Sequence, residues 1–163
     1  MALAFRNVAA SPADDVTTWP YEALVSALER GLVPDWRPIL DEIGRQPWGP
    51  LARRVEDYVS YSTSPGVAAL FGRAVTSARA QADRRDRAEV ARRVRDAVAA
   101  SGLTSARFAE LIGTSASRLS TYASGAVTPS AALLVRMERA SGQSSRAERS
   151  SAPRRLPTRE TGC

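Results

Sequence analysis

The chain has 163 residues, a net charge of +6, no histidine and one cysteine, Cys163, and all 23 of its basic residues are arginine. Without histidine, lysine or a second cysteine, it cannot form a thiolate zinc site, an intramolecular disulfide, a Schiff base or a phosphate-binding P-loop. Its acidic residues lie among arginines on apparent helix faces, which favours a solvated surface over a carboxylate active site. We therefore expect no catalytic residues, no cofactor and no bound metal.

The positive charge is concentrated in the C-terminal half. Residues 1–82 contain eight arginines and nine acidic residues, residues 83–142 contain ten and six, and residues 143–163 contain five and two. This asymmetry suits a polyanionic partner, because phosphate neutralisation supplies most non-specific affinity for nucleic acids. No segment approaches the roughly 18 apolar residues of a membrane helix, and residues 1–6 lack a secretory signal, so we expect a cytoplasmic protein with no membrane partner.

Residues 1–82 are expected to form an N-terminal helical domain. Turn signals separate helix-sized segments, and no β-branched alternation indicates a sheet, so the predicted fold is all-α. Thr17 or Thr18 is the predicted cap of the first helix and Gly31 its stop. Further helices are predicted from residue 34, over about 51–60 and from 67 onward. The tryptophans of this domain are predicted to pack in its core rather than to line a ligand pocket: Trp19, Trp36 and Trp48.

A domain boundary is predicted where the pattern becomes almost purely charged, over residues 81–89. Such a segment is consistent with one long helix or with a joint between two helices. We favour the joint, because Asp86 and Glu89 have the spacing of a capping box. It would separate residues 1–82 from a second domain formed by residues 83–142.

The second domain is predicted to contain four short helices, the first over about 88–101. Thr104 is the predicted cap of the second helix, and Gly113 takes the left-handed backbone that the following tight turn requires. Ser115 caps the third helix, residues 116–123. Thr128 and Pro129 have the pattern of an N-cap and a first helical residue, and they are predicted to open the fourth helix.

One small core is expected to join these four helices. Ala109 is predicted to lie where a second helix crosses closely, so a small side chain is needed there. The apolar residues predicted to face this core are Val90, Val94, Val98, Phe108, Leu111, Ile112, Leu119, Tyr122, Leu133, Leu134 and Met137.

Residues 104–125 resemble the helix-turn-helix of the Cro/repressor (XRE) family. The resemblance covers about residues 88–141, and its motifs occur at fixed spacing. The family's apolar-Ala-x-x-x-Gly core is matched by Phe108, Ala109 and Gly113, and its serine cap by Ser115. Leu119 and Tyr122 match its pair of inward-facing residues. Gly125, Pro129 and Ser130 match its Gly-x-x-x-Pro-Ser segment.

The family places its second motif helix in the DNA major groove. The resemblance implies that Ala116, Ser117 and Thr121 face bases, that Ser105 and neighbouring amides meet phosphate, and that Arg118 and Ser124 lie near the backbone or groove edge. The candidate DNA-binding residues are Thr104, Ser105, Ser115, Ala116, Ser117, Arg118, Ser120, Thr121 and Ser124. The family often has Gln, Arg or Asn at base-facing positions. The side chains at these positions here are short. Either sequence specificity comes partly from contacts with thymine methyl groups and from DNA shape, or Arg118 contributes more of it than this position usually does.

The resemblance implies a sequence-specific transcriptional regulator, a repressor in our interpretation, that binds double-stranded DNA as a homodimer. The N-terminal domain would then dimerise or sense a signal. The alternative is an antitoxin or adaptor, in which residues 1–82 bind a protein partner such as a toxin or a signalling protein while the helix-turn-helix autoregulates its operon. Residues 143–163 are predicted to be a disordered tail rich in Arg, Ser and Pro, which either adds phosphate contacts or is passive.

Overall fold

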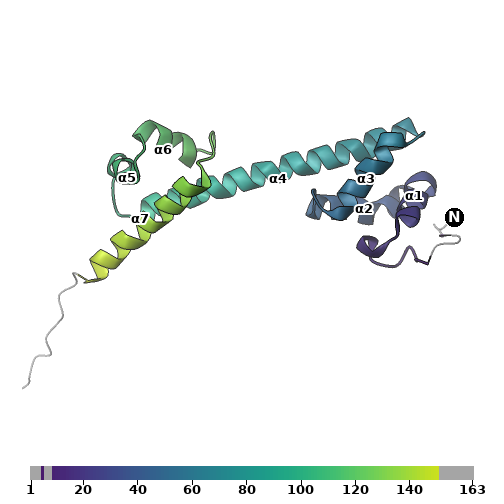
Figure 1. Ribbon diagram of the computed structural model, residues 1–163, viewed down its shortest axis with the longest axis horizontal. Coiled ribbons are helices and arrows are strands. Elements are labelled where there is room, and N and C mark those ends of the chain that lie inside the picture. Colours follow the sequence, from purple (N-terminus) through teal and green to yellow (C-terminus); the bar gives the residue numbers. More distant parts are fainter. Residues whose placement is uncertain (1–4, 6–8, 151–163) are drawn as a thin grey trace, which may run out of the picture. The chain divides into compact units, whose positions relative to one another are not determined.

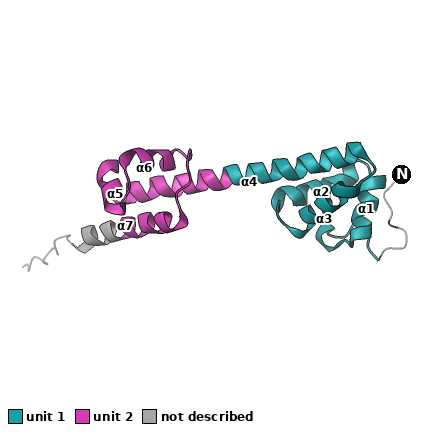
Figure 2. Cartoon of the chain, turned by 45° about the horizontal axis from the view of Figure 1, so that its top comes forward, with its two compact units in different colours: residues 1–84 teal, residues 85–163 magenta. Residues whose placement is uncertain are grey.

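The computed structural model describes residue 5 and residues 9–150, with side chains described as far as residue 142. Within these residues every regular element is helical, comprising seven α-helices and one short 3-10 helix (Figure 1). The predicted all-α class is therefore confirmed for the described part of the chain. The chain divides into two compact units, unit 1 (residues 1–84) and unit 2 (residues 85–163), which Figure 2 shows in different colours.

Unit 1 begins with the 3-10 helix Val16–Thr18, whose cap is Asp15. The predicted cap at Thr17 or Thr18 is wrong, because Pro20 disfavours helical backbone in the residue before it. Helix α1 therefore starts only after this proline, and Gly31 ends it as predicted. The α-helices of this unit are α1 (Tyr21–Arg30), α2 (Val33–Arg45), α3 (Pro50–Tyr61) and the first part of α4 (Pro65–Ala100).

Two of the three tryptophans belong to the core of unit 1. Trp19 is buried, and Trp36 is half-buried, donates its indole N–H to the Ala27 carbonyl (2.9 Å) and packs edge-on against Phe71. The core prediction is wrong for Trp48, which is 47% exposed. The fully buried large side chains around Trp19 are Leu24, Leu28, Ile39, Ile43, Val55, Tyr58 and Phe71.

Tyr58 is fully buried on α3, yet its hydroxyl has no hydrogen-bond partner among the described residues. Burying an unpaired hydroxyl costs about 1–3 kcal/mol.

The substitution Tyr58→Phe removes this hydroxyl and keeps the ring that packs edge-on against Tyr61. We expect it to raise the free energy of unfolding by about 1 kcal/mol, measured by urea denaturation with tryptophan fluorescence. In the matched control, Tyr61→Phe, the lost hydroxyl is one that bonds Tyr21 (2.6 Å), and stability should fall slightly. A loss of stability in Tyr58→Phe would contradict the expectation.

Helix α4 runs from Pro65 to Ala100 without a break. The prediction of a joint between two helices over residues 81–89 is therefore wrong. Residues 81–89 contain only Ala, Gln, Arg, Asp and Glu, with no glycine or proline. Most of these are good helix formers. A charged composition removes the apolar period but does not interrupt backbone hydrogen bonding, and the capping-box spacing of Asp86 and Glu89 is not used.

Unit 2 consists of the last part of α4 with α5 (Ser105–Ile112), α6 (Ala116–Ala123) and α7 (Ala131–Ser150). Its buried core contains Val94, Ala97, Phe108, Ala109, Ile112, Leu119 and Met137. The partly buried residues Val98, Tyr122, Leu133 and Leu134 pack against that core, as predicted.

Three expectations for unit 2 are wrong. Leu111 is 57% exposed, because no described side chain of another helix covers its side of α5. Helix α7 begins after Ser130, whose hydroxyl accepts the Leu133 amide hydrogen (3.2 Å), and not at Thr128 and Pro129. Pro129 is buried ahead of the helix.

Helix α7 also continues eight residues past 142, to Ser150, so its backbone occupies the start of the predicted tail. The rest of the tail prediction lies outside the described residues.

Candidate nucleic-acid interface

A tight turn at Gly113 joins α5 to α6. Gly113 has φ +76° and ψ +40°, which is left-handed backbone as predicted. The Gly113 amide donates to the Glu110 carbonyl (3.1 Å) and the Thr114 amide to the Ala109 carbonyl (2.9 Å). These two bonds form a Schellman motif, the arrangement that satisfies the last carbonyls of a helix. The turn is therefore set by its own backbone hydrogen bonds and by the conformational freedom of glycine.

Hydroxyl groups cap the N-termini of both motif helices. The Thr104 hydroxyl accepts the Arg107 amide hydrogen (3.3 Å), and the Ser115 hydroxyl accepts that of Arg118 (3.2 Å). Both caps were predicted from sequence. Each oxygen is used as an acceptor, so each hydroxyl hydrogen stays available to a phosphate oxygen. The free amides at the start of α5, near Ser105, add a second set of donors.

Two arginines fix the C-terminal ends of the motif helices, a role that the sequence did not reveal. Arg136 of α7 donates to the Ile112 carbonyl at the end of α5 (2.9 Å), and Arg95 of α4 donates to the Ala123 carbonyl at the end of α6 (2.6 Å). A cation at a helix C-terminus is favoured by the helix dipole. These contacts depend on how the helices cross, and no spacing in the sequence signals them.

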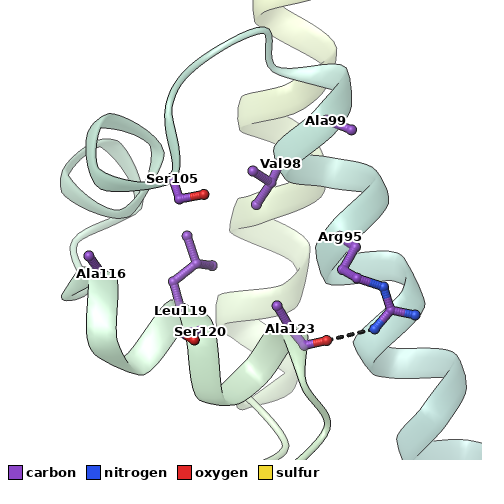
Figure 3. Close-up of a pocket in the computed structure, with 8 residues that line it drawn as sticks. All are labelled: Arg95, Val98, Ala99, Ser105, Ala116, Leu119, Ser120 and Ala123. Carbon is purple, nitrogen blue, oxygen red and sulfur yellow. Dashed lines mark hydrogen bonds between the residues drawn. The ribbon is translucent and has the colours of Figure 1, made fainter.

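A groove of about 440 Å³ lies beside α6, between this helix, the start of α5 and α4 (Figure 3). It brings together three of the predicted residues, Ser105, Ala116 and Ser120. Figure 3 shows the remaining lining residues, with the hydrogen bond from Arg95 to Ala123 at one end: Arg95, Val98, Ala99, Leu119 and Ala123. Ser105 and Ser120 thus supply hydroxyls to a largely apolar groove.

The hydroxyls of α6 differ in what they can offer a partner. Thr121 donates to the Arg118 carbonyl (2.8 Å) and Ser124 to the Thr121 carbonyl (3.1 Å), so both hydroxyl hydrogens are used within the helix. Thr121 then presents mainly its methyl group. Ser117 and Ser120 are exposed, and within the described part of the chain their hydroxyls make no hydrogen bond. They can both donate and accept.

The surface of α6 carries positive charge that no carboxylate of the described residues compensates. The helix has no acidic residue, and its Arg118 is exposed and forms no ion pair with any described residue. Four described carboxylates of unit 2 pair with other arginines, and two of them bind Arg92 along α4, Glu89 (2.6 Å) and Asp96 (2.6 Å). Hydrogen bonding from Arg92 holds the pKa of Glu89 below its usual value. Ion pairs also join Arg93 to Glu138 and Arg107 to Glu110.

The described residues contain no group of three or more acidic, histidine or cysteine side chains placed to hold a metal ion. Nor does any helix in this part of the structure have the length and hydropathy needed to cross a membrane.

Comparisons with known protein families, with curated proteins and with solved structures give no match to this chain.

Proposed function

We propose that this chain is a cytoplasmic, sequence-specific DNA-binding transcriptional regulator, a repressor that acts as a homodimer, and not an enzyme. The observation that carries the proposal is the pair of short capped helices joined at a left-handed glycine. The second of these helices exposes hydroxyls and an arginine that no described carboxylate neutralises. This is the arrangement with which a recognition helix enters the major groove.

In this proposal α6 lies in the major groove. Ser117 and Ser120 exchange hydrogen bonds with base edges, and the Thr121 methyl group contacts thymine methyl groups. The capped start of α5, at Thr104 and Ser105, binds a phosphate through amide and hydroxyl hydrogens. Short side chains bring the helix backbone close to the bases, so DNA shape contributes to specificity alongside direct contacts.

Fluorescence anisotropy with the promoter DNA of the protein's own gene tests the proposal, with scrambled DNA of equal length as the reference. We expect a preference for the promoter at near-physiological salt and an affinity that falls as salt rises, because phosphate contacts release counterions. Equal, weak and wholly salt-sensitive binding to both DNAs would reject specific regulation.

The substitution Arg118→Ala is expected to weaken promoter binding by about tenfold to a hundredfold, the range for loss of one arginine contact to DNA. The thermal melting temperature should not change, because the Arg118 side chain is exposed and forms no ion pair with a described residue. The matched control is Arg92→Ala, which removes the same charge. Arg92 is already paired with two carboxylates and lies beside α7. Equal losses in both variants would show that only net charge matters.

A further inference from the structure

One face of α2 is largely exposed, and among the described residues only its half-buried Leu40 also packs against the core of unit 1. Leu40 and Asp41 are adjacent, and the other intervals are three or four positions, so these residues lie along one side of the helix: Val33, Arg37, Leu40, Asp41 and Gly44. Val33 is 71% exposed and the adjacent Leu32 is 61% exposed. A hollow of about 460 Å³ lies along this side, with Val33, Pro34 and Leu40 as its apolar lining. The opposite side of the helix packs into the core through Ile39 and Ile43.

Arg37 and Asp41 supply the charges of this face. Both are exposed, and neither forms an ion pair or hydrogen bond with a described residue. A basic and an acidic side chain four positions apart are complementary to the same pair on an antiparallel copy of the helix. In such an arrangement Arg37 of each copy lies opposite Asp41 of the other. One surface that carries both charges is therefore complementary to itself, as a two-fold interface requires.

Gly44 lies in the same stripe, in the last turn of α2. A methyl group added there would meet no described atom within 4 Å, so packing within the described part of the chain does not require glycine. Its φ is not positive, so capping does not require glycine either. Glycine is unfavourable in a helix compared with alanine. A second backbone approaching closely at this point would explain it.

We propose that this face of α2 binds the same face of a second copy of the chain, antiparallel and about a two-fold axis. Arg37 and Asp41 of one copy then pair with Asp41 and Arg37 of the other, and Val33 packs over Gly44 of the second copy. The inference rests on the homodimer in the proposed function and names the surface through which it forms. A foreign partner would need neither the balanced charges nor their four-residue spacing, so the second copy is the occupant that the face fits.

Sedimentation velocity of the full chain over a dilution series tests this pairing by charge reversal. We expect the unchanged protein to be a dimer. Arg37→Asp and Asp41→Arg should each raise the dimer dissociation constant by at least about tenfold, because like charges then face each other at two symmetry-related places. The double variant restores opposite charges and should return the constant close to its original value. Arg53→Asp changes an exposed arginine of α3 and serves as the charge control.

A steric variant tests the close approach separately. Gly44→Leu should also dissociate the dimer. Because leucine favours the helix more than glycine does, the melting temperature of the resulting monomer should not fall. A monomeric unchanged protein, single variants that remain dimeric, or a double variant that stays dissociated would each overturn the proposed interface. DNA is absent from these measurements, so the two proposals can fail separately. A dimer that does not bind DNA would reject the DNA-binding role and leave this interface standing. A monomer that binds DNA would reject this interface and the homodimer, but not DNA binding.

Discussion

Replacing Phe108 with alanine is expected to lower the stability of unit 2 by about 3–5 kcal/mol, the range for a fully buried phenylalanine. Phe108 is fully buried and belongs to the core formed by α4, α5, α6 and α7. Small domains are stable by about 5–15 kcal/mol in total. The loss is therefore a large fraction of the total stability expected for a domain of this size.

The position of the tryptophans makes this prediction measurable for each unit. Trp19, Trp36 and Trp48 all lie in unit 1. In Phe108→Ala, urea denaturation should give an unchanged transition by tryptophan fluorescence, while circular dichroism loses helical signal at lower urea. Leu111→Ala is the matched control on the same helix. Leu111 is 57% exposed, so the expected change is within about 0.5 kcal/mol. Equal effects of the two substitutions would contradict the packing of α5 described above.

Replacing Gly113 with valine is expected to destabilise unit 2 by about 1–3 kcal/mol, the cost of holding a non-glycine residue in left-handed backbone. A side chain there would meet only an Arg136 nitrogen, 3.5 Å from the added Cβ, which is an ordinary contact. The penalty therefore comes from φ +76° and not from crowding. Valine should be worse than alanine, because it is β-branched.

Gly113→Asn distinguishes the backbone effect from a general intolerance of side chains. Asparagine enters the left-handed region more readily than other non-glycine residues. We expect the order of stability to be glycine, asparagine, alanine and then valine, measured by chemical denaturation followed by circular dichroism. A valine variant as stable as the original would show that the turn does not hold this conformation in solution.

The features predicted correctly from the sequence are those set by neighbouring residues. Thr104, Ser115 and Gly113 act through atoms at most five positions away, so the local pattern contains the required information. The same holds for Gly31, which ends α1. Inward-facing residues such as Phe108 and Leu119 followed from helical spacing alone.

The features that the sequence could not reveal depend on contacts between distant segments. Arg95 and Arg136 each bond a carbonyl more than twenty positions away, so no periodicity marks them. Leu111 has helical spacing suited to the core, but its burial depends on whether another helix covers it. Two possible N-caps lie close together before α7. Thr128 followed by Pro129 fits a helix start, and so does Ser130. The structure uses Ser130, with Pro129 buried ahead of the helix.

The structure of α6 separates the residues that hold the helix in place from those that face outward. Ser115 caps it, Leu119 anchors it in the core and Arg95 fixes its end, whereas Ser117 and Ser120 are exposed. Exposed substitutions usually change stability by no more than about 0.5 kcal/mol. The outward positions are thus free to vary over evolutionary time, or to be randomised in a library, without loss of the fold. The same helix could acquire a new binding preference through a few neutral steps.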